Sequence, residues 1–174
     1  MEEKKSMNKI IETQRLYLRK LELSDAGELS KVLSDTVSMK YYPHPFSLQE
    51  VENWIKWNIS NYKTYGFGLW AVIRKEDNAF LGDCGITMQN IDGEQLPEVG
   101  FHIIKEFTRK GYASEAAEAV INYAGQQFKF SKIYSYCEVH NTPSQGVMIK
   151  AGMVREKEFT EDGVDKIVYS KNVL

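Results

Sequence analysis

The spacing of apolar residues predicts one strand and two helices in the first part of the chain. Apolar positions that alternate with polar ones predict the strand over residues 10–21. Ser24-Asp25 is a typical helix start, and the prolines within Tyr42–Phe46 would interrupt the helix that follows. Ser47 is expected to cap a second helix that runs to about Tyr62. The apolar face expected for the first helix consists of Leu29, Val32, Leu33 and Val37.

Beyond Gly66 and Gly68, which are expected to end the second helix, the spacing becomes typical of strands. Further strands are predicted at residues 69–74, 80–89, 98–104 and 132–139. Further helices are predicted at residues 111–128 and 142–151. A final hairpin is expected to turn at Asp162-Gly163. Helices beside a mixed sheet in this order predict an α+β fold in a single domain over residues 1–174, with residues 1–8 as a flexible tail.

Composition narrows the classes of function. The 174 residues are 43% hydrophobic and 26% charged, with a formal net charge of -2. No broad cationic surface is therefore available, and neither nucleic acid nor a membrane is expected as a partner. Apolar runs are shorter than the roughly 20 residues of a membrane helix, and the N-terminus lacks the apolar region of a secretory signal. Cys84 and Cys137 have no metal-ligand spacing, which predicts no metal and a reducing, cytoplasmic location.

A short basic segment with a glycine precedes the helix expected at residues 111–128. Gly111 permits tight backbone geometry, and the first N–H groups of a helix have no partner within it. These donors, the positive helix end and the charges of Arg109 and Lys110 together suit a pyrophosphate. The segment matches neither a nucleoside triphosphate loop nor the dinucleotide pattern G-x-G-x-x-G. A helix start with solvated basic neighbours is the alternative interpretation.

Five segments of the chain, in order, match one family pattern. Thr108–Ala113 resembles the second half of Q/R-x-x-G-x-G/A, although Thr108 stands where that pattern has Gln or Arg. The other four segments are Thr13–Arg19, which resembles T-x-R-L-x-L-R, Leu81–Gly85 (x-G-x-x-G), Glu98–Phe101 (E-I-G-Y) and Asn141–Met153 (N-x-x-S, then K-x-G-F). Together these segments resemble the GNAT superfamily of N-acetyltransferases. The similarity is greatest to the RimJ/RimL-like branch, which includes ribosomal-protein N-terminal acetyltransferases.

The resemblance implies that acetyl-CoA, as cosubstrate, gives its acetyl group directly to a primary amine. The amine would belong to a protein or peptide N-terminus or to a small molecule. The implied fold is a mostly antiparallel mixed sheet flanked by helices, with a V-shaped splay between the fourth and fifth strands. The residues that the resemblance assigns to acetyl-CoA are Phe101, His102, Ile103, Arg109, Lys110, Gly111, Tyr112, Ala113, Ser114, Asn141 and Ser144.

Two catalytic residues also follow from the resemblance. Glu98 would help to remove a proton from the amine through water, and Ser144 would protonate the departing thiolate. The serine takes this role because the tyrosine that many members use is replaced by Met148, which donates no proton. His102 is kept as a secondary base. A solvent-facing glutamate, an ordinary helix-start serine and a packed histidine are the alternatives.

The link between the first two expected helices is assigned to the acceptor. In the family this region borders the acceptor site, so Tyr41, Tyr42 and Phe46 are predicted to bind the substrate together with Glu98. Trp54 would extend the same aromatic wall. The alternative is that these aromatic side chains only pack the helices against the sheet.

Other interpretations remain open from the sequence alone. Thr108 and Met148 depart from the family pattern, which would suit a non-catalytic acetyl-CoA-binding module. The acceptor would alternatively be an aminoglycoside-like drug. A two-step transfer through Cys137 is a further alternative. The sequence also leaves a homodimer open.

Overall fold

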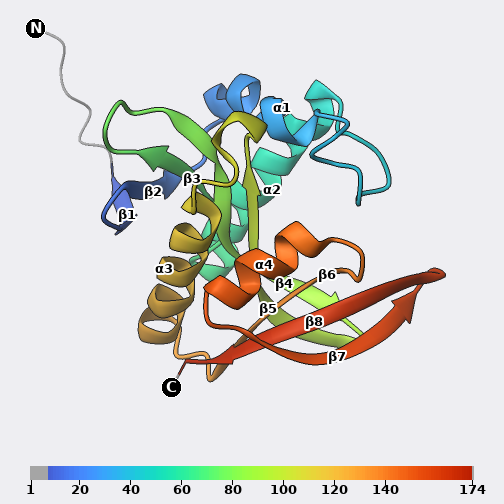
Figure 1. Ribbon diagram of the computed structural model, residues 1–174. Coiled ribbons are helices and arrows are strands. Elements are labelled where there is room, and N and C mark those ends of the chain that lie inside the picture. The colour runs from blue at the N-terminus through green and yellow to red at the C-terminus, as the bar shows by residue number, and fades with distance from the viewer. Residues whose placement is uncertain (1–7, 174) are drawn as a thin grey trace, which may run out of the picture.

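The computed structural model describes residues 8–173, in which eight strands form one sheet with helices on both faces (Figure 1). Most of the expected flexible tail, residues 1–7, lies outside the described residues. The strands are β1 (Lys9–Glu12), β2 (Leu16–Lys20), β3 (Leu69–Arg74), β4 (Phe80–Ile91), β5 (Glu94–Ile103), β6 (Lys132–Glu138), β7 (Val154–Glu161) and β8 (Val164–Asn172). The helices are α1 (Ala26–Leu33), α2 (Leu48–Tyr65), α3 (Tyr112–Gln127) and α4 (Thr142–Lys150).

The sheet has the order β1-β2-β3-β4-β5-β6-β8-β7, and its neighbouring strands are antiparallel except for the pair β5 and β6. These two strands are parallel and share a single register position, Glu98 opposite Tyr134. Away from this position they separate and leave main-chain groups of β5 without a strand partner. The predicted α+β class is confirmed. The strands predicted as fourth and fifth are β5 and β6, so the splay lies where it was expected.

The prediction of one strand over residues 10–21 is wrong, because β1 and β2 form an antiparallel pair there. The chain reverses between Thr13 and Leu16. The Thr13 N–H donates to the Leu16 carbonyl oxygen (2.9 Å), and the Thr13 hydroxyl oxygen accepts from the Leu16 N–H (3.0 Å). A side chain thus supplies a turn that neither glycine nor proline marks in the sequence.

Two other boundaries differ from the prediction. Helix α1 ends at Leu33, and Val37, which was expected on its apolar face, is 55% exposed. The Asp35 carboxylate accepts from the Ser38 N–H (2.8 Å), and this local bond favours a turn over another helical turn. Strand β5 begins at Glu94 and not at Glu98, because its pairing with β4 continues to the tight turn.

The predicted ends of α2 and the predicted last turn are confirmed, whereas the expected helix start at Ser24-Asp25 is a short 3-10 turn without a side-chain cap on α1. Helix α2 begins with a capping box in which the Ser47 hydroxyl oxygen accepts from the Glu50 N–H (3.2 Å). It ends at Gly66, whose φ of 79° is left-handed. The hairpin of β7 and β8 turns at Asp162 and Gly163 as predicted.

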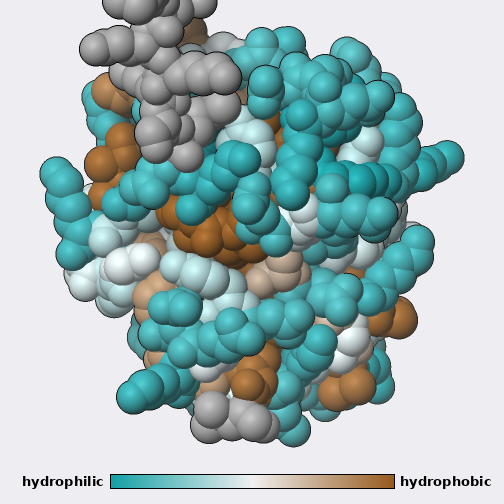
Figure 2. All heavy atoms as spheres, turned by 90° about the vertical axis from the view of Figure 1, so that its left-hand side faces the viewer, coloured by the Kyte–Doolittle hydropathy of each residue, from teal (hydrophilic) through white to brown (hydrophobic). Residues whose placement is uncertain are grey.

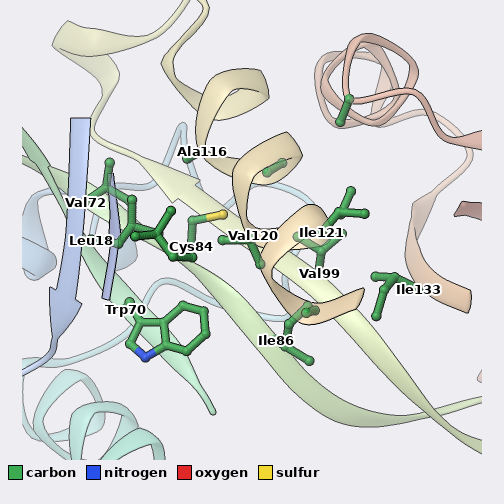
Figure 3. Packing of buried hydrophobic residues seen from close by; sticks show 14 of the residues in the cluster. Leu18, Trp70, Val72, Cys84, Ile86, Val99, Ala116, Val120, Ile121 and Ile133 are labelled. Atoms are coloured by element: carbon green, nitrogen blue, oxygen red, sulfur yellow. The ribbon is translucent and has the colours of Figure 1, made fainter. Parts of the chain in front are cut away.

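Each face of the sheet has its own apolar core. Helix α3 places Ala116, Val120 and Ile121 against Cys84 and Val99 of the sheet (Figure 3). On the other face α1 and α2 cover a second cluster, in which fully buried side chains include Leu29, Leu33, Val51 and Ile55. Both faces of the central strands are therefore buried, which fixes the positions of side chains on β4 and β5.

The surface is mostly hydrophilic on the face that Figure 2 presents, where hydrophobic residues appear as separate patches. Along residues 8–173, no helix combines the length and the apolar character that a bilayer crossing requires.

Candidate active site

A cleft of ≈ 340 Å³ lies where β5 and β6 separate. It is lined from both strands, from the start of α4, and from the link that precedes α2. The lining residues that were predicted as site residues are Tyr41, Tyr42, Glu98, Phe101, His102, Asn141 and Ser144, and Trp54 of the predicted aromatic wall lines it as well.

Glu98 lies at the one position where β5 and β6 are paired. Its carboxylate accepts a hydrogen bond from the Tyr136 N–H (3.3 Å). Burial raises the pKa of Glu98 to about 8, and the Tyr136 N–H and the charge of Lys166 oppose this rise only in part. A carboxylate with this pKa at a cleft wall can exchange protons near neutral pH.

The start of α4 brings two predicted residues together. The Asn141 side chain caps the helix by accepting from the Ser144 N–H (3.2 Å), and Pro143 occupies its first turn. The Ser144 side chain lines the cleft, and its hydroxyl has no hydrogen bond to another described residue. Met148 also lines the cleft and is 2% exposed, so the position one helical turn further supplies only an apolar wall.

A chain of hydrogen bonds leads from the buried sheet to the cleft. The His102 Nδ1 lies 2.7 Å from a carboxylate oxygen of Asp83, and its Nε2 lies 2.8 Å from the Tyr42 hydroxyl. The indole N–H of Trp54 donates to the other Asp83 oxygen (3.0 Å). Asp83 is 0% exposed. Tyr42 is 41% exposed, yet burial of its hydroxyl and the charges of Glu98 and Asp83 raise its pKa.

Asp83 was not among the predicted site residues, although the sequence carries a signal for it. It is the one charged residue within the strand Phe80–Gln89, a run that is otherwise apolar or small up to Ile86. A carboxylate in a buried strand needs hydrogen-bond partners. Register supplies one of them, since Asp83 is paired with His102 across β4 and β5.

The predicted acceptor residues divide into two groups. Tyr41 and Tyr42 line the cleft, and the Tyr41 hydroxyl donates to the His140 carbonyl oxygen (2.9 Å) just before α4. Phe46 does not line the cleft. Its ring packs edge-on against Trp54, with ring centroids 5.7 Å apart, so it supports the wall from behind.

The segment before α3 lies outside the cleft lining, as does Ile103. The backbone is left-handed at Arg109 (φ 61°) and at Gly111 (φ 82°). The first helical hydrogen bond runs from the Glu115 N–H to the Gly111 carbonyl oxygen, and no described protein group accepts from the N–H groups of residues 109–114. Successive free N–H groups in such a turn form an anion-binding concavity. Ala113 and Ser114, also predicted to bind acetyl-CoA, supply two of them.

Arg15, which was not among the predicted site residues, stabilises the segment before α3. Arg15, in the turn between β1 and β2, donates from Nη1 to the Lys110 carbonyl oxygen (3.0 Å). Its guanidinium also lies over the Tyr112 ring, 4.3 Å from the centroid, and contacts the Glu115 carboxylate at 3.3 Å. Tyr112, predicted to bind acetyl-CoA, is buried beneath it. Sequence reasoning missed this role because the contacts join residues about 95 positions apart.

The two cysteines lie in different parts of the molecule, but burial favours the protonated thiol in both. Cys84 is buried in the core with its pKa raised well above its usual range by burial. Cys137 lines the cleft, and burial together with the neighbouring Glu98 charge raises its pKa to about 12. Neither thiol is arranged to ionise near neutral pH, as a nucleophilic cysteine must.

Comparison with known proteins gives consistent matches. Residues 15–154 match the acetyltransferase (GNAT) domain family. The chain is 32% identical to YkkB of Bacillus subtilis (strain 168) over 160 residues, which are 91% of this chain and 93% of that protein. The crystal structure of a GNAT-family acetyltransferase from Bacillus anthracis has a TM-score of 0.80 at 30% identity and covers 94% of this chain and 98% of its own.

A more distant structure shows the fold alone. RimL, a ribosomal L7/L12 alpha-N-protein acetyltransferase solved in complex with coenzyme A, has a TM-score of 0.75 at 17% identity. The match covers 92% of this chain and 96% of that chain.

Proposed function

This chain belongs to the GNAT family of N-acetyltransferases, and on that premise we propose that it transfers acetyl directly from acetyl-CoA to a primary amine. One observation carries the proposal. Glu98, whose carboxyl group has a pKa near 8, and Ser144 line the same cleft, the first from β5 and the second from the start of α4.

Acetyl-CoA would be held by two features. The free N–H groups of residues 109–114 would bind its pyrophosphate, with Arg109 and Lys110 adding positive charge. The unpaired edge of β5 at Phe101–Ile103 would bond the amide groups of the pantetheine arm as an added strand would. Asn141, which lines the cleft at the start of α4, would bond the same arm.

Glu98 would act on the amine. A primary amine has a pKa of about 8 at a peptide N-terminus and about 10 in an alkylamine, so it reaches the cleft largely protonated. The amine must lose a proton before its lone pair can attack the thioester carbonyl. The ionised carboxylate takes that proton, directly or through water, and its raised pKa makes it a better base than an ordinary glutamate.

Ser144 would act on the leaving group. The C–S bond breaks with its electron pair on the sulfur, and the free hydroxyl of Ser144 can donate a hydrogen bond there and pass a proton to the sulfur as it takes one from solvent water. A thiolate has a pKa of about 8.5 and is a tolerable leaving group, so this assistance is expected to be smaller than that of Glu98.

Direct transfer is favoured over a two-step route. A covalent route would need a thiolate at Cys137, the one cysteine in the cleft lining, but its raised pKa keeps it protonated. The amine would therefore attack acetyl-CoA itself.

The test is release of free CoA thiol from acetyl-CoA with a panel of amines. The panel includes peptides with free N-termini, alkylamines and aminoglycosides, because each of these classes carries a primary amine. Turnover is expected with at least one amine, and Glu98→Gln is expected to lower kcat by about 10²-fold or more. Glu76→Gln, in an exposed turn, is the matched control.

Two outcomes would contradict the proposal. Calorimetry that shows CoA binding without turnover on any amine would indicate a non-catalytic binding module. Equal turnover by wild type and Glu98→Gln would remove the role of the carboxylate.

A further inference from the structure

Asp83 is a fully buried carboxylate with both oxygens engaged. It is 0% exposed, and its oxygens lie 2.7 Å from the His102 Nδ1 and 3.0 Å from the Trp54 Nε1. An ionised carboxylate in a protein interior is costly unless it is hydrogen-bonded or paired. The polar group is therefore retained for the hydrogen bonds that it makes.

These contacts fix the state of the histidine ring. An ionised carboxylate only accepts hydrogen bonds, so with Asp83 ionised the neighbouring Nδ1 of His102 carries the proton of the ring. In the neutral ring Nε2 is then the acceptor. The Tyr42 hydroxyl, 2.8 Å away, donates to it. His102 Nε2 can therefore accept a proton from the cleft by way of the Tyr42 hydroxyl.

The proposed reaction has a second proton to remove. An ammonium group that becomes an amide nitrogen loses two protons in all. Glu98 accounts for the first, which leaves before attack. The second leaves the nitrogen as the N–C bond forms. In the overall balance it matches the proton that the CoA sulfur takes up, but the group that receives it from the nitrogen has still to be assigned.

Tyr42 is placed to connect the two regions of the cleft. Glu98 and His102 are four residues apart on β5 and share a face, which is roughly 13 Å along a strand. Tyr42 lines the same cleft and bonds to His102, while the charge of Glu98 acts on its hydroxyl. Its hydroxyl therefore brings the distant ring nitrogen closer to the position of the amine.

We propose that Asp83, His102 and Tyr42 form a second proton path, which removes the proton released when the amine attacks. The path rests on the proposed acetyl transfer. As the N–C bond forms, the nitrogen gives its proton to the Tyr42 oxygen, and Tyr42 passes its own proton to His102 Nε2. The imidazolium that results is paired with Asp83. The C–S electron pair leaves on the CoA sulfur, which is protonated through Ser144. The serine takes its proton back from solvent water, and the imidazolium releases its proton to solvent after the product has formed. Tyr42 is then a catalytic residue, and Asp83 is a positioning residue.

The test combines kinetics with the state of the ring. Tyr42→Phe, His102→Gln and Asp83→Asn are compared with Tyr65→Phe, which alters an exposed tyrosine outside the cleft. kcat is measured with the amine that wild type turns over fastest, together with KM for acetyl-CoA. The protonated ring nitrogen is identified by ¹⁵N NMR, in which the three histidines give few signals and His102→Gln assigns the relevant one.

The path predicts a specific pattern. Each of the three variants on the path lowers kcat by about 10- to 100-fold with KM for acetyl-CoA within about twofold, and the control leaves both unchanged. The double variant Tyr42→Phe/His102→Gln is no slower than the slower single variant, because both act on one path. The wild-type His102 ring is protonated at Nδ1, and Asp83→Asn loses that preference.

Other results overturn the path. A wild-type ring protonated at Nε2 contradicts the hydrogen-bond directions. Additive losses, or an unchanged kcat in Tyr42→Phe, remove the tyrosine step. If Asp83→Asn does not fold, the two variants at the cleft surface decide. A wild type that turns over no amine contradicts the proposed function itself, a result distinct from a functioning enzyme that is indifferent to these variants.

Discussion

At the scale of single residues, the chemistry depends on burial. Glu98, Tyr42 and Cys137 line one cleft, and burial raises the pKa of all three. The consequences differ because a raised pKa improves a carboxylate as a base while it keeps a thiol inert. The role of each residue in this cleft therefore depends on its type as well as on its burial.

The pH dependence of kcat/KM is expected to report on Glu98. The active form is the carboxylate, so its fraction rises with pH up to about 8. With an alkylamine of pKa near 10, which enters as its ammonium form, the logarithm of kcat/KM should rise with slope 1 below pH 8 and level off between pH 8 and about pH 10. Glu98→Gln should show slope 1 throughout. A wild-type profile without a break near pH 8 would contradict this assignment.

Cys137→Ser is expected to retain kcat within about threefold, because the thiol is not an intermediate. Iodoacetamide should label Cys137 slowly at pH 7, since burial holds its pKa at about 12. Labelling is measured by mass spectrometry of the intact chain. Isolation of an acetylated Cys137 during turnover would instead establish a two-step route.

At the scale of elements, the segment before α3 depends on a brace from the N-terminal hairpin. Arg15 bonds the Lys110 carbonyl oxygen, stacks on Tyr112 and contacts Glu115. These contacts hold the left-handed conformation at Arg109, which is uncommon in a residue other than glycine. The turn between β1 and β2 thereby supports the proposed pyrophosphate site.

Arg15→Gln is expected to weaken CoA binding by about tenfold, because a loop that must be ordered on binding costs affinity. The dissociation constant is measured by calorimetry for wild type, Arg15→Gln and the control Arg155→Gln in the exposed strand β7. Binding of pantetheine, which has no diphosphate, should be unaffected. An equal loss for CoA and pantetheine would indicate general unfolding and not a local effect on the loop.

At the scale of the whole molecule, the site has a cost in stability. Glu98 is half-buried in the cleft wall, and its pKa is about 8 against a usual value of 4.5, so the folded state favours the protonated form. Below pH 4.5 the carboxyl group of Glu98 is protonated in both the folded and the unfolded chain, so its raised pKa does not lower the free energy of unfolding. The penalty grows as pH rises toward 8, where the unfolded chain holds a carboxylate and the folded chain still holds the acid.

The free energy of unfolding of the ligand-free wild type should therefore fall by about 1–2 kcal/mol more than that of Glu98→Gln between pH 5 and pH 9. The expected magnitude is kept small because water in the open cleft hydrates the carboxylate in part. Urea unfolding followed by circular dichroism measures it. Parallel curves for the two proteins would show that Glu98 is hydrated and not buried.

Much of this arrangement could be predicted from the sequence because it depends on local signals. The capping box of Ser47, the left-handed Gly66 and the apolar face of α3 each follow from neighbouring residues. The chain reversal at Thr13 could not, because a threonine side chain forms it without glycine or proline. In the site, the bond between Asp83 and His102 depends on the register of β4 and β5, which no single segment encodes.

The bond between the Tyr41 hydroxyl and the His140 carbonyl joins two walls of the cleft across 99 positions of sequence. One such bond contributes about 1 kcal/mol, so thermal motion breaks it in a substantial fraction of molecules. Each break would free the link that carries Tyr41 to move away from the start of α4, and a wide acceptor would depend on this movement more than a slender amine would. The entrance would then distinguish amines by width in their association rates before any chemistry begins.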